Sequence, residues 1–214
     1  MVREVFEQSP TSGQPSVLLQ HPNGASCEIQ LHGATVTSYK TAQGREVLFL
    51  SQTAVFNGCQ AIRGGIPVVF PQFLRPDPTL PSHGFARTSA WELSDEEKES
   101  GASPGAVTAV LTLSDSAATR ALWPFAFHLR YVVELEETQL TTTLHITNTS
   151  DAAFRCQVDT VLWNPWEAKG AGMKDLERDG YQRFVCVEPG LVSAPRSVAP
   201  SERLTLAQTL ASPH

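Results

Sequence analysis

Residues 127–135 read FHLRYVVEL, and apolar and polar side chains alternate along this stretch with Val132 as the one exception. Alternation with a period of two places the apolar side chains on one face of a strand, as in an antiparallel sheet buried on one side. The same pattern recurs along the chain, at residues 25–31, 107–113, 140–146, 154–158 and 204–210. We therefore predict an all-β protein built from short antiparallel strands, arranged as a β-sandwich.

Glycine and proline residues separate these alternating rows, for example at 22–24, 101–105 and 189–190, where turns are expected. Helical patterns are weak, and the strongest candidate for a helix is the short stretch from Lys174 to Arg178. The chain has 214 residues with no internal repeat, low-complexity tract or linker, which suits one domain of ordinary size. We therefore expect a single domain that spans residues 1–214.

The composition limits the classes of function. The formal net charge is −6 at pH 7, so neither a nucleic acid nor an anionic membrane surface is expected as a partner. The four cysteines, at 27, 59, 156 and 186, are too far apart for a CxxC metal or redox site. No apolar run approaches the ~18 residues that span a bilayer, and the first residues lack the apolar stretch of a secretory signal. We therefore expect a cytoplasmic protein with reduced cysteines and no metal site.

Residues 58–91 are rich in proline and glycine, so little of this segment can form regular β-ladders. Its polar side chains include Arg63, Gln72, His83 and Arg87. Two arginines with a histidine between them suit an anionic ligand, because a guanidinium group binds phosphate or carboxylate through two parallel hydrogen bonds. Alternatively, the arginines satisfy carbonyl groups of irregular loops and the histidine is an ordinary loop residue. Composition alone leaves both interpretations open.

Two later segments offer further candidates. Glu188 follows the apolar residues 184–187 and precedes a Pro-Gly turn. A carboxylate in partly apolar surroundings has a raised pKa, which suits a general base, although an exposed glutamate at a strand end is the alternative. Trp163 and Trp166 flank an Asn-Pro pair, and they form either an aromatic floor for a sugar ring or part of the core.

Taken together, these segments resemble the glucose-6-phosphate 1-epimerase (hexose-6-phosphate mutarotase) family, a branch of the aldose 1-epimerases. The resemblance rests on four motifs that occur in this order: IRGGIPVVFPQF at 62–73, LPSHGFAR at 80–87, TVLWNPWEAKG at 160–170 and GYQRFVCVEPG at 180–190. The segments HGATVTSYK at 32–40 and VLFLS at 47–51 are similar to the first strands of that family. The match extends from about residue 20 to residue 210.

The resemblance implies a galactose-mutarotase-like antiparallel β-sandwich that interconverts the α and β anomers of a hexose 6-phosphate, without metal or organic cofactor. It implies that Glu188 is the general base and that His83 is the first of two active-site histidines. Arg63 and Arg87 match arginines that bind the sugar phosphate, Gln72 lies in the same loop, and Trp163 is a candidate for sugar contact. We expect a small-molecule hexose 6-phosphate as the only partner and a monomeric protein.

One part of the family pattern is missing. Family members carry a second active-site histidine, which acts as the general acid, and an aspartate before the Trp-Asn-Pro-Trp segment. Here the chain passes almost directly from residues 148–157 to Asp159, where the family has several strands, so about 60–80 residues are absent. The chain is thus expected to be internally shortened between about residues 157 and 159 and to have weak activity or none. A non-catalytic hexose-phosphate-binding protein and an inactive splice-type form are the alternatives.

Overall fold

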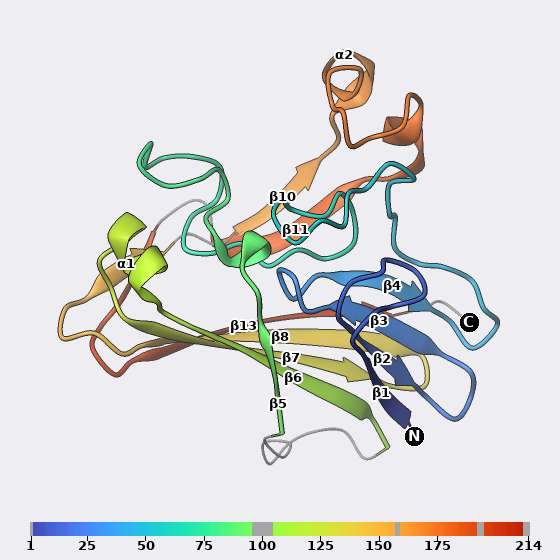
Figure 1. Ribbon diagram of the computed structural model, residues 1–214, viewed down its shortest axis with the longest axis horizontal. Helices are drawn as coiled ribbons and strands as arrows, with labels where there is room; N and C mark the ends of the chain where they lie inside the picture. The colour runs from blue at the N-terminus through green and yellow to red at the C-terminus, as the bar shows by residue number, and fades with distance from the viewer. Residues whose placement is uncertain (1, 96–104, 157–158, 192–194, 212–214) are drawn as a thin grey trace.

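Two antiparallel sheets pack face to face around a shared hydrophobic core and form a β-sandwich (Figure 1). The structure, a computed structural model, describes residues 2–95, 105–156, 159–191 and 195–211, and for residues 2, 159–162 and 188–191 it describes the backbone only. The strand order is β13-β8-β7-β6-β5 in the larger sheet and β1-β2-β3-β4 in the smaller sheet. The predicted all-β fold class is therefore confirmed.

The strands have the following bounds. The smaller sheet consists of β1 (Val2–Phe6), β2 (Ser16–Gln20), β3 (Ser26–Gln30) and β4 (Val36–Lys40). The larger sheet consists of β5 (Glu92–Ser94), β6 (Val107–Ser114), β7 (Phe127–Leu135), β8 (Gln139–Asn148) and β13 (Arg203–Ala211). Two short pairs complete the described strands: β9 (Phe154–Cys156) with β12 (Arg196–Val198), and β10 (Asp159–Trp163) with β11 (Cys186–Leu191).

The alternating pattern of β7 and β8 fixes how these central strands pair. Leu129 lies opposite Ile146 and Tyr131 lies opposite Leu144, and all four side chains are buried. A shift of the register by one residue would move every one of these side chains to the solvent face. The inward face of β7 and β8 therefore packs against apolar side chains of the smaller sheet, such as Ile29, in a continuous core.

The helices do not lie where the sequence suggests. Residues 174–178 form turns and not a helix, so that prediction is wrong. Helix α1 (Ala117–Leu122) begins instead at Ser116, whose hydroxyl accepts a hydrogen bond from the backbone N–H of Thr119, while the Thr119 hydroxyl accepts one from the N–H of Ser116. This capping box begins a helix of only six residues, which is too short to show a helical period in the sequence.

The segment between residues 163 and 187, here called the projecting segment, extends away from the sandwich together with β10 and β11 (Figure 1). It contains α2 (Trp166–Gly170) and the 3-10 helix η2 (Gly180–Arg183). Several of its apolar side chains are exposed, among them Val185, Val187 and Trp166, the last with 71% of its surface accessible. This exposure is consistent with the internal shortening that the sequence indicates between about residues 157 and 159, next to β10.

The proline-rich loop between residues 58 and 91 is anchored in the core by Phe70. Its buried ring packs against Trp123, Phe127 and Phe154, with the Trp123 ring centroid 5.3 Å away. The carbonyl oxygen of Phe70 accepts a hydrogen bond of 3.0 Å from the backbone N–H of Phe85. Residues 70–85 are thus a closed loop whose two ends meet over the aromatic end of the core.

Candidate functional site

The loop between Phe70 and Phe85 carries two of the predicted site residues, Gln72 and His83, and Arg87 follows it in the 3-10 helix η1 (Ala86–Thr88). Gly84 has φ +70° and forms a β-bridge with Phe70, and a Cβ atom at this position would overlap the Phe70 carbonyl oxygen. Only glycine fits such a close backbone approach in the left-handed region. The glycine that follows His83 in the sequence is therefore what allows the loop to close and to hold the histidine in place.

His83 is half-buried and fixed by its own backbone. Its residue lies at φ +63°, and its N–H donates a 2.7 Å hydrogen bond to the carbonyl oxygen of Leu74. The Leu74 N–H approaches Nδ1 of the histidine at 3.4 Å, which favours the tautomer with its proton on Nε2. The ring of Phe73 lies edge-on to the imidazole with centroids 4.8 Å apart. The histidine is thus a positioned side chain and not an ordinary solvated loop residue.

The surroundings of His83 keep its imidazole neutral. Burial is the main cause, and the positive charges of Arg87, Arg63 and Lys169 add to it, so that the pKa of His83 falls from 6.5 to about 4. At pH 7 an imidazole with this pKa is protonated in only about one molecule in a thousand. His83 is therefore a hydrogen-bonding group at neutral pH and a poor proton donor in the absence of a bound anion.

The charges of the two predicted arginines both act on His83, and each guanidinium group also contacts another residue. The Nη2 atom of Arg87 donates to the carbonyl oxygen of Ser82 at 2.8 Å, as the loop-satisfying interpretation expects. The Nη2 atom of Arg63 lies 3.1 Å from Oδ2 of Asp175 in the projecting segment. About a third of the Arg63 side chain remains accessible to solvent. Both guanidinium groups are therefore partly engaged by the protein while their charges act on His83.

Gln72 is buried and its amide holds the loop together. Its Nε2 donates to the carbonyl oxygens of Asp77 and Pro81, each at 3.1 Å, and its Oε1 accepts from the backbone N–H of Asp77 at 3.0 Å. These bonds brace the interior of the loop that carries His83. The contacts of Gln72 indicate a positioning role, and its direct contact with substrate stays a prediction.

The remaining candidates, Trp163 and Glu188, lie on β10 and β11. Trp163, the last residue of β10, pairs with Cys186 of β11, and Glu188 lies two residues further along β11 opposite Val161. The ammonium group of Lys169 lies over the Trp163 ring, 5.1 Å from its centroid. The side chain of Glu188 is outside the described residues, as is the shortened junction at residues 157–158, so its role as a base stays a prediction.

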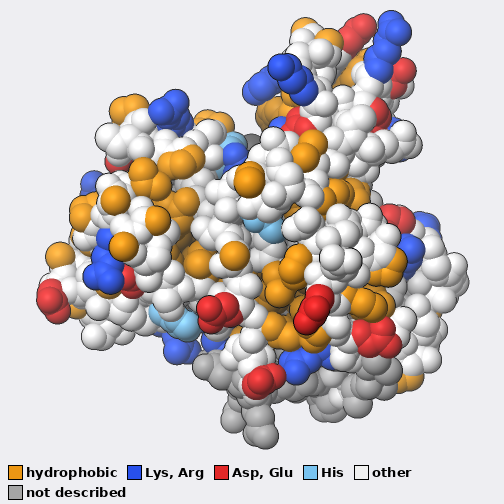
Figure 2. Space-filling view, in the orientation of Figure 1, with side chains coloured by type: hydrophobic (Ala, Val, Ile, Leu, Met, Phe, Trp, Pro, Cys, Tyr) orange, Lys and Arg blue, Asp and Glu red, His pale blue; other side chains and the backbone are white. Residues whose placement is uncertain are grey.

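Arg63, Arg87 and Lys169, three cations that all act on His83, are here called the cationic cluster. The sequence places two of the three in the proline-rich loop, and the third lies in the motif at 160–170 without being marked there as a site residue. Lys169 follows Arg87 by about 80 residues in the sequence. The docking of the projecting segment lets its charge act on His83. Figure 2 shows an open notch between this segment and the loops beside it, with cationic and histidine side chains visible there.

The described residues contain no group of three or more His, Cys, Asp or Glu side chains that could hold a metal ion. Within the same part of the chain, no helix has both the length and the apolar character needed to cross a membrane.

Comparison with known proteins identifies the family of the chain. A family model described as Aldose 1-epimerase matches residues 15–158, about two thirds of the chain. The chain belongs to the aldose 1-epimerase family. A relative of this family member from Cenchrus ciliaris, named "Putative glucose-6-phosphate 1-epimerase", is 27% identical and covers 89% of this chain and 82% of its own. A relative of the same name from Salmonella typhimurium is also 27% identical and covers 91% and 89%.

The epimerase fold is also seen in solved structures. The crystal structure of YeaD from Salmonella typhimurium, described as a "putative mutarotase", superposes with a TM-score of 0.76 at 23% identity and covers 98% of this chain and 97% of that one. This likeness confirms the predicted galactose-mutarotase-like sandwich. The predicted family is likewise confirmed.

The alignments also bear on the internal shortening of this epimerase-family chain. The match to the Cenchrus relative extends over 272 residues, whereas 89% of the 214 residues here is about 190. The relative therefore carries about 80 residues within the matched span that this chain lacks. The family match ends at residue 158, at the predicted junction.

The depressed pKa of His83 leads to a prediction on stability. Its folded pKa of about 4 lies below the value of 6.5 for a free histidine, so the unfolded chain takes up a proton first as the pH falls. The stabilisation that neutral His83 provides is therefore complete above about pH 6.5 and is lost between pH 6.5 and 4. We expect the difference in unfolding free energy between the wild type and His83→Asn to shrink across this window in urea titrations. Asparagine tolerates the positive φ of this position.

Proposed function

We propose that the chain binds hexose 6-phosphates at the cationic cluster and, as an aldose 1-epimerase-family protein, acts on their α and β anomers. The observation that carries this proposal is a positioned His83 whose pKa is lowered by burial and by the charges of Arg87 and Arg63. A phosphate monoester carries a charge between about −1.5 and −2 at pH 7 and three acceptor oxygens, so guanidinium groups bind it more strongly than they bind a neutral sugar.

The chemistry assigned to the site is proton transfer. Glu188 takes the proton from the anomeric hydroxyl, the bond between C1 and the ring oxygen breaks, and the ring oxygen takes up a proton from an acid. The open-chain aldehyde turns its other face and the ring closes by the reverse steps, which leaves no net change in protons. His83 donates a hydrogen bond from Nε2 to a sugar oxygen and orients the ring during this sequence.

A non-catalytic binding protein is the second candidate function. It is favoured by the neutrality of His83 and by the absence of the second family histidine, because both leave the ring oxygen without a strong acid. Polarimetry on freshly dissolved α-glucose 6-phosphate separates the two functions. A rate above the spontaneous one supports the epimerase, and binding without acceleration supports the binding protein.

Replacing an arginine of the cluster is expected to weaken binding of the phosphorylated sugar selectively. Arg63→Ala or Arg87→Ala should each cost about 1.5–3 kcal/mol of affinity for glucose 6-phosphate, the range for hydrogen bonds to charged groups. The loss for glucose should be much smaller, as measured by isothermal titration calorimetry.

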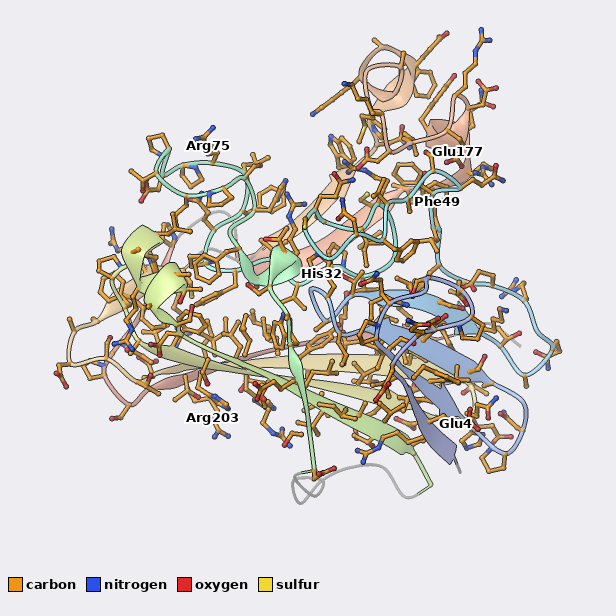
Figure 3. All side chains as sticks on the ribbon, in the orientation of Figure 1. Glu4, His32, Phe49, Arg75, Glu177 and Arg203 are labelled. Carbon is orange, nitrogen blue, oxygen red and sulfur yellow. The ribbon has the colours of Figure 1, made fainter. Side chains whose placement is uncertain are left out.

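Arg75→Ala is the matched control for these two variants. Arg75 lies in the same loop, at the outer end labelled in Figure 3, and its Nη2 donates to the carbonyl oxygen of Pro78 at 2.7 Å. It is not among the charges that act on His83. We expect Arg75→Ala to bind like the wild type. Equal losses for both sugars, or an equal loss in Arg75→Ala, would contradict phosphate recognition by Arg63 and Arg87.

A further inference from the structure

We propose that Asn57 is a site of spontaneous deamidation, at which the side-chain amide becomes a carboxylate by way of a cyclic succinimide. This modification goes beyond the proposed function, since it needs no sugar ligand and takes place outside the cationic cluster. Asn57 and Asn23 are the two asparagines of the chain that precede a glycine. Glycine favours the reaction because it has no side chain to hinder the approach of its nitrogen to the amide carbon.

The reaction joins two groups of one Asn-Gly pair. The backbone nitrogen of the glycine loses its proton and attacks Cγ of the asparagine, the bond between Cγ and Nδ2 breaks, and ammonia leaves. Water then opens the five-membered ring at either of its two carbonyl groups, which gives aspartate or isoaspartate, so that the net change is one water taken up and one ammonia released. The rate therefore depends on how freely the glycine nitrogen and the side-chain amide can reach the geometry of attack.

At Asn23 both reacting groups are held in hydrogen bonds. The Gly24 N–H, whose nitrogen would attack, donates to the carbonyl oxygen of His21 at 3.0 Å. The amide that would leave donates through Nδ2 to the carbonyl oxygen of Glu137 at 2.8 Å. Its Oδ1 accepts from the N–H of Ala25 at 3.0 Å and lies 2.8 Å from Nδ1 of His21. The turn between β2 and β3 thus restrains the nucleophile and the leaving group.

Asn57 differs from Asn23 at both reacting groups. Among the residues that the structure describes, neither the Gly58 N–H nor Nδ2 of Asn57 has a hydrogen-bond partner. Oδ1 of Asn57 accepts from the N–H groups of Cys59 at 2.9 Å and Gln60 at 3.1 Å, which polarises the amide carbonyl as at Asn23. Residues 57–60 are exposed, so water reaches the ring that forms. The two pairs therefore share an activated carbonyl and differ in the freedom of their nitrogens.

This difference predicts selective modification in the folded protein. Two hydrogen bonds must break before Asn23 reacts, and a typical protein hydrogen bond changes an equilibrium by roughly fivefold. We expect Asn57 to deamidate more than tenfold faster than Asn23. Unfolding removes the bonds at Asn23, so the two pairs should then react at similar rates.

Deamidation changes the charge and the main chain of this loop. Either product adds one negative charge to the chain. Isoaspartate also brings the former side-chain carbonyl into the main chain, which becomes longer by one methylene, so the turn from Asn57 to Gln60 is lost. The carbonyl oxygen of Gln60 accepts a hydrogen bond of 2.9 Å from Nε2 of His32, whose backbone forms a β-bridge with Ala90. Isoaspartate at residue 57 is therefore expected to release the loop from His32.

The test follows both asparagines in one sample of the full chain. Folded protein is kept at about 37 °C and pH 8 and digested with trypsin, and Asn23 and Asn57 then lie in different peptides, 4–40 and 46–63. Mass spectrometry measures the gain of one mass unit, and peptide fragmentation locates the changed residue and separates isoaspartate from aspartate. A parallel incubation in guanidinium chloride gives the rates in the unfolded chain, which should agree within about threefold.

Two variants serve as controls. Asn57→Gln, whose longer side chain would have to form a less favourable six-membered ring, should gain no mass at residue 57. Asn23→Gln should leave the rate at Asn57 unchanged. Hydrogen exchange at the N–H groups of Cys59 and Gln60 should be faster in aged wild type than in equally aged Asn57→Gln, because the acceptor of both groups is displaced.

The outcomes decide the proposal without reference to sugar binding. A more than tenfold preference for Asn57 in the folded protein, together with similar rates in the unfolded chain, supports it. Equal rates at Asn57 and Asn23 in the folded protein, or no modification at Asn57, would overturn it. The same preference in folded and unfolded chain would assign the difference to neighbouring sequence and would overturn the structural argument. The proposed function stands in each case.

Discussion

Restoring the missing internal segment is expected to raise the rate of anomer equilibration of glucose 6-phosphate by about 10²–10⁴-fold, the usual contribution of a positioned general acid. The variant carries the roughly 70 extra residues of the Salmonella typhimurium relative inserted between Gln157 and Val158. The physical reason is that ring opening requires one proton to leave the anomeric oxygen and another to reach the ring oxygen. These two oxygens lie on different parts of the sugar, so one carboxylate does not serve both.

The described residues offer no replacement for the missing acid near His83. The histidine itself has a pKa of about 4, so its protonated form is scarce at pH 7 in the free protein. Solvent water is left to protonate the ring oxygen, which is slow.

Polarimetry of the two proteins under identical conditions measures the effect. The control is the restored chain in which the inserted active-site histidine is changed to glutamine, and it should return to the rate of the shortened chain. Equal rates for the shortened and the restored protein would contradict the prediction and would point to phosphate-bound His83 as the acid.

Gly84→Ala is expected to destabilise the protein by about 2–4 kcal/mol, because it combines left-handed backbone strain with overlap of two atoms. The new Cβ would meet the Phe70 carbonyl oxygen, and φ at this position is +70°. The carbonyl cannot move freely, since it accepts hydrogen bonds from the N–H groups of Phe85 and Ala86 and its ring is buried. Urea denaturation followed by circular dichroism gives the unfolding free energy.

Gly44→Ala is the matched control for this variant. Its φ is +78°, so the backbone strain is similar, but a Cβ there would meet no atom within 4 Å. We expect a loss of only about 1 kcal/mol from strain alone. The prediction does not hold if the two alanine variants lose the same stability, because the close approach of Gly84 and Phe70 would then contribute nothing.

The sandwich could be predicted from the sequence because the alternation of apolar and polar side chains that marks a half-buried strand is a local pattern. The period of two along residues 127–135 and 140–146 places one face toward the core, and the observed pairing of Leu129 with Ile146 keeps it there. The helices were predicted poorly because they are too short to show a helical period. Helix α1 depends on one hydroxyl cap at Ser116, and residues 174–178 follow turns in which Asp175 and Glu177 contact Arg63 and Ser51 from a distant part of the chain.

The candidate site, too, could be predicted from the sequence only in part. Arg63, His83 and Arg87 lie in one unusual stretch of loop, and their proximity could be expected from the sequence. Lys169 could not be placed, because its position depends on the docking of a segment about 80 residues further along, and a single lysine carries no pattern of its own. The family could be identified from the sequence motifs, whereas the place of Lys169 depends on tertiary contacts.

The closure of the loop between Phe70 and Gly84 also bears on how fast a ligand can bind. Fixing the backbone of one residue costs about 1–2 kcal/mol of conformational entropy, so ordering even a few loop residues on binding would weaken affinity considerably. Here the bridge at Gly84 and the amide of Gln72 fix the loop in the ligand-free protein. The loop therefore becomes ordered when the protein folds, and it does not have to become ordered when a ligand binds. Encounter with a sugar phosphate is then limited by diffusion and by the attraction of the cations, with no slow rearrangement of this loop to precede it.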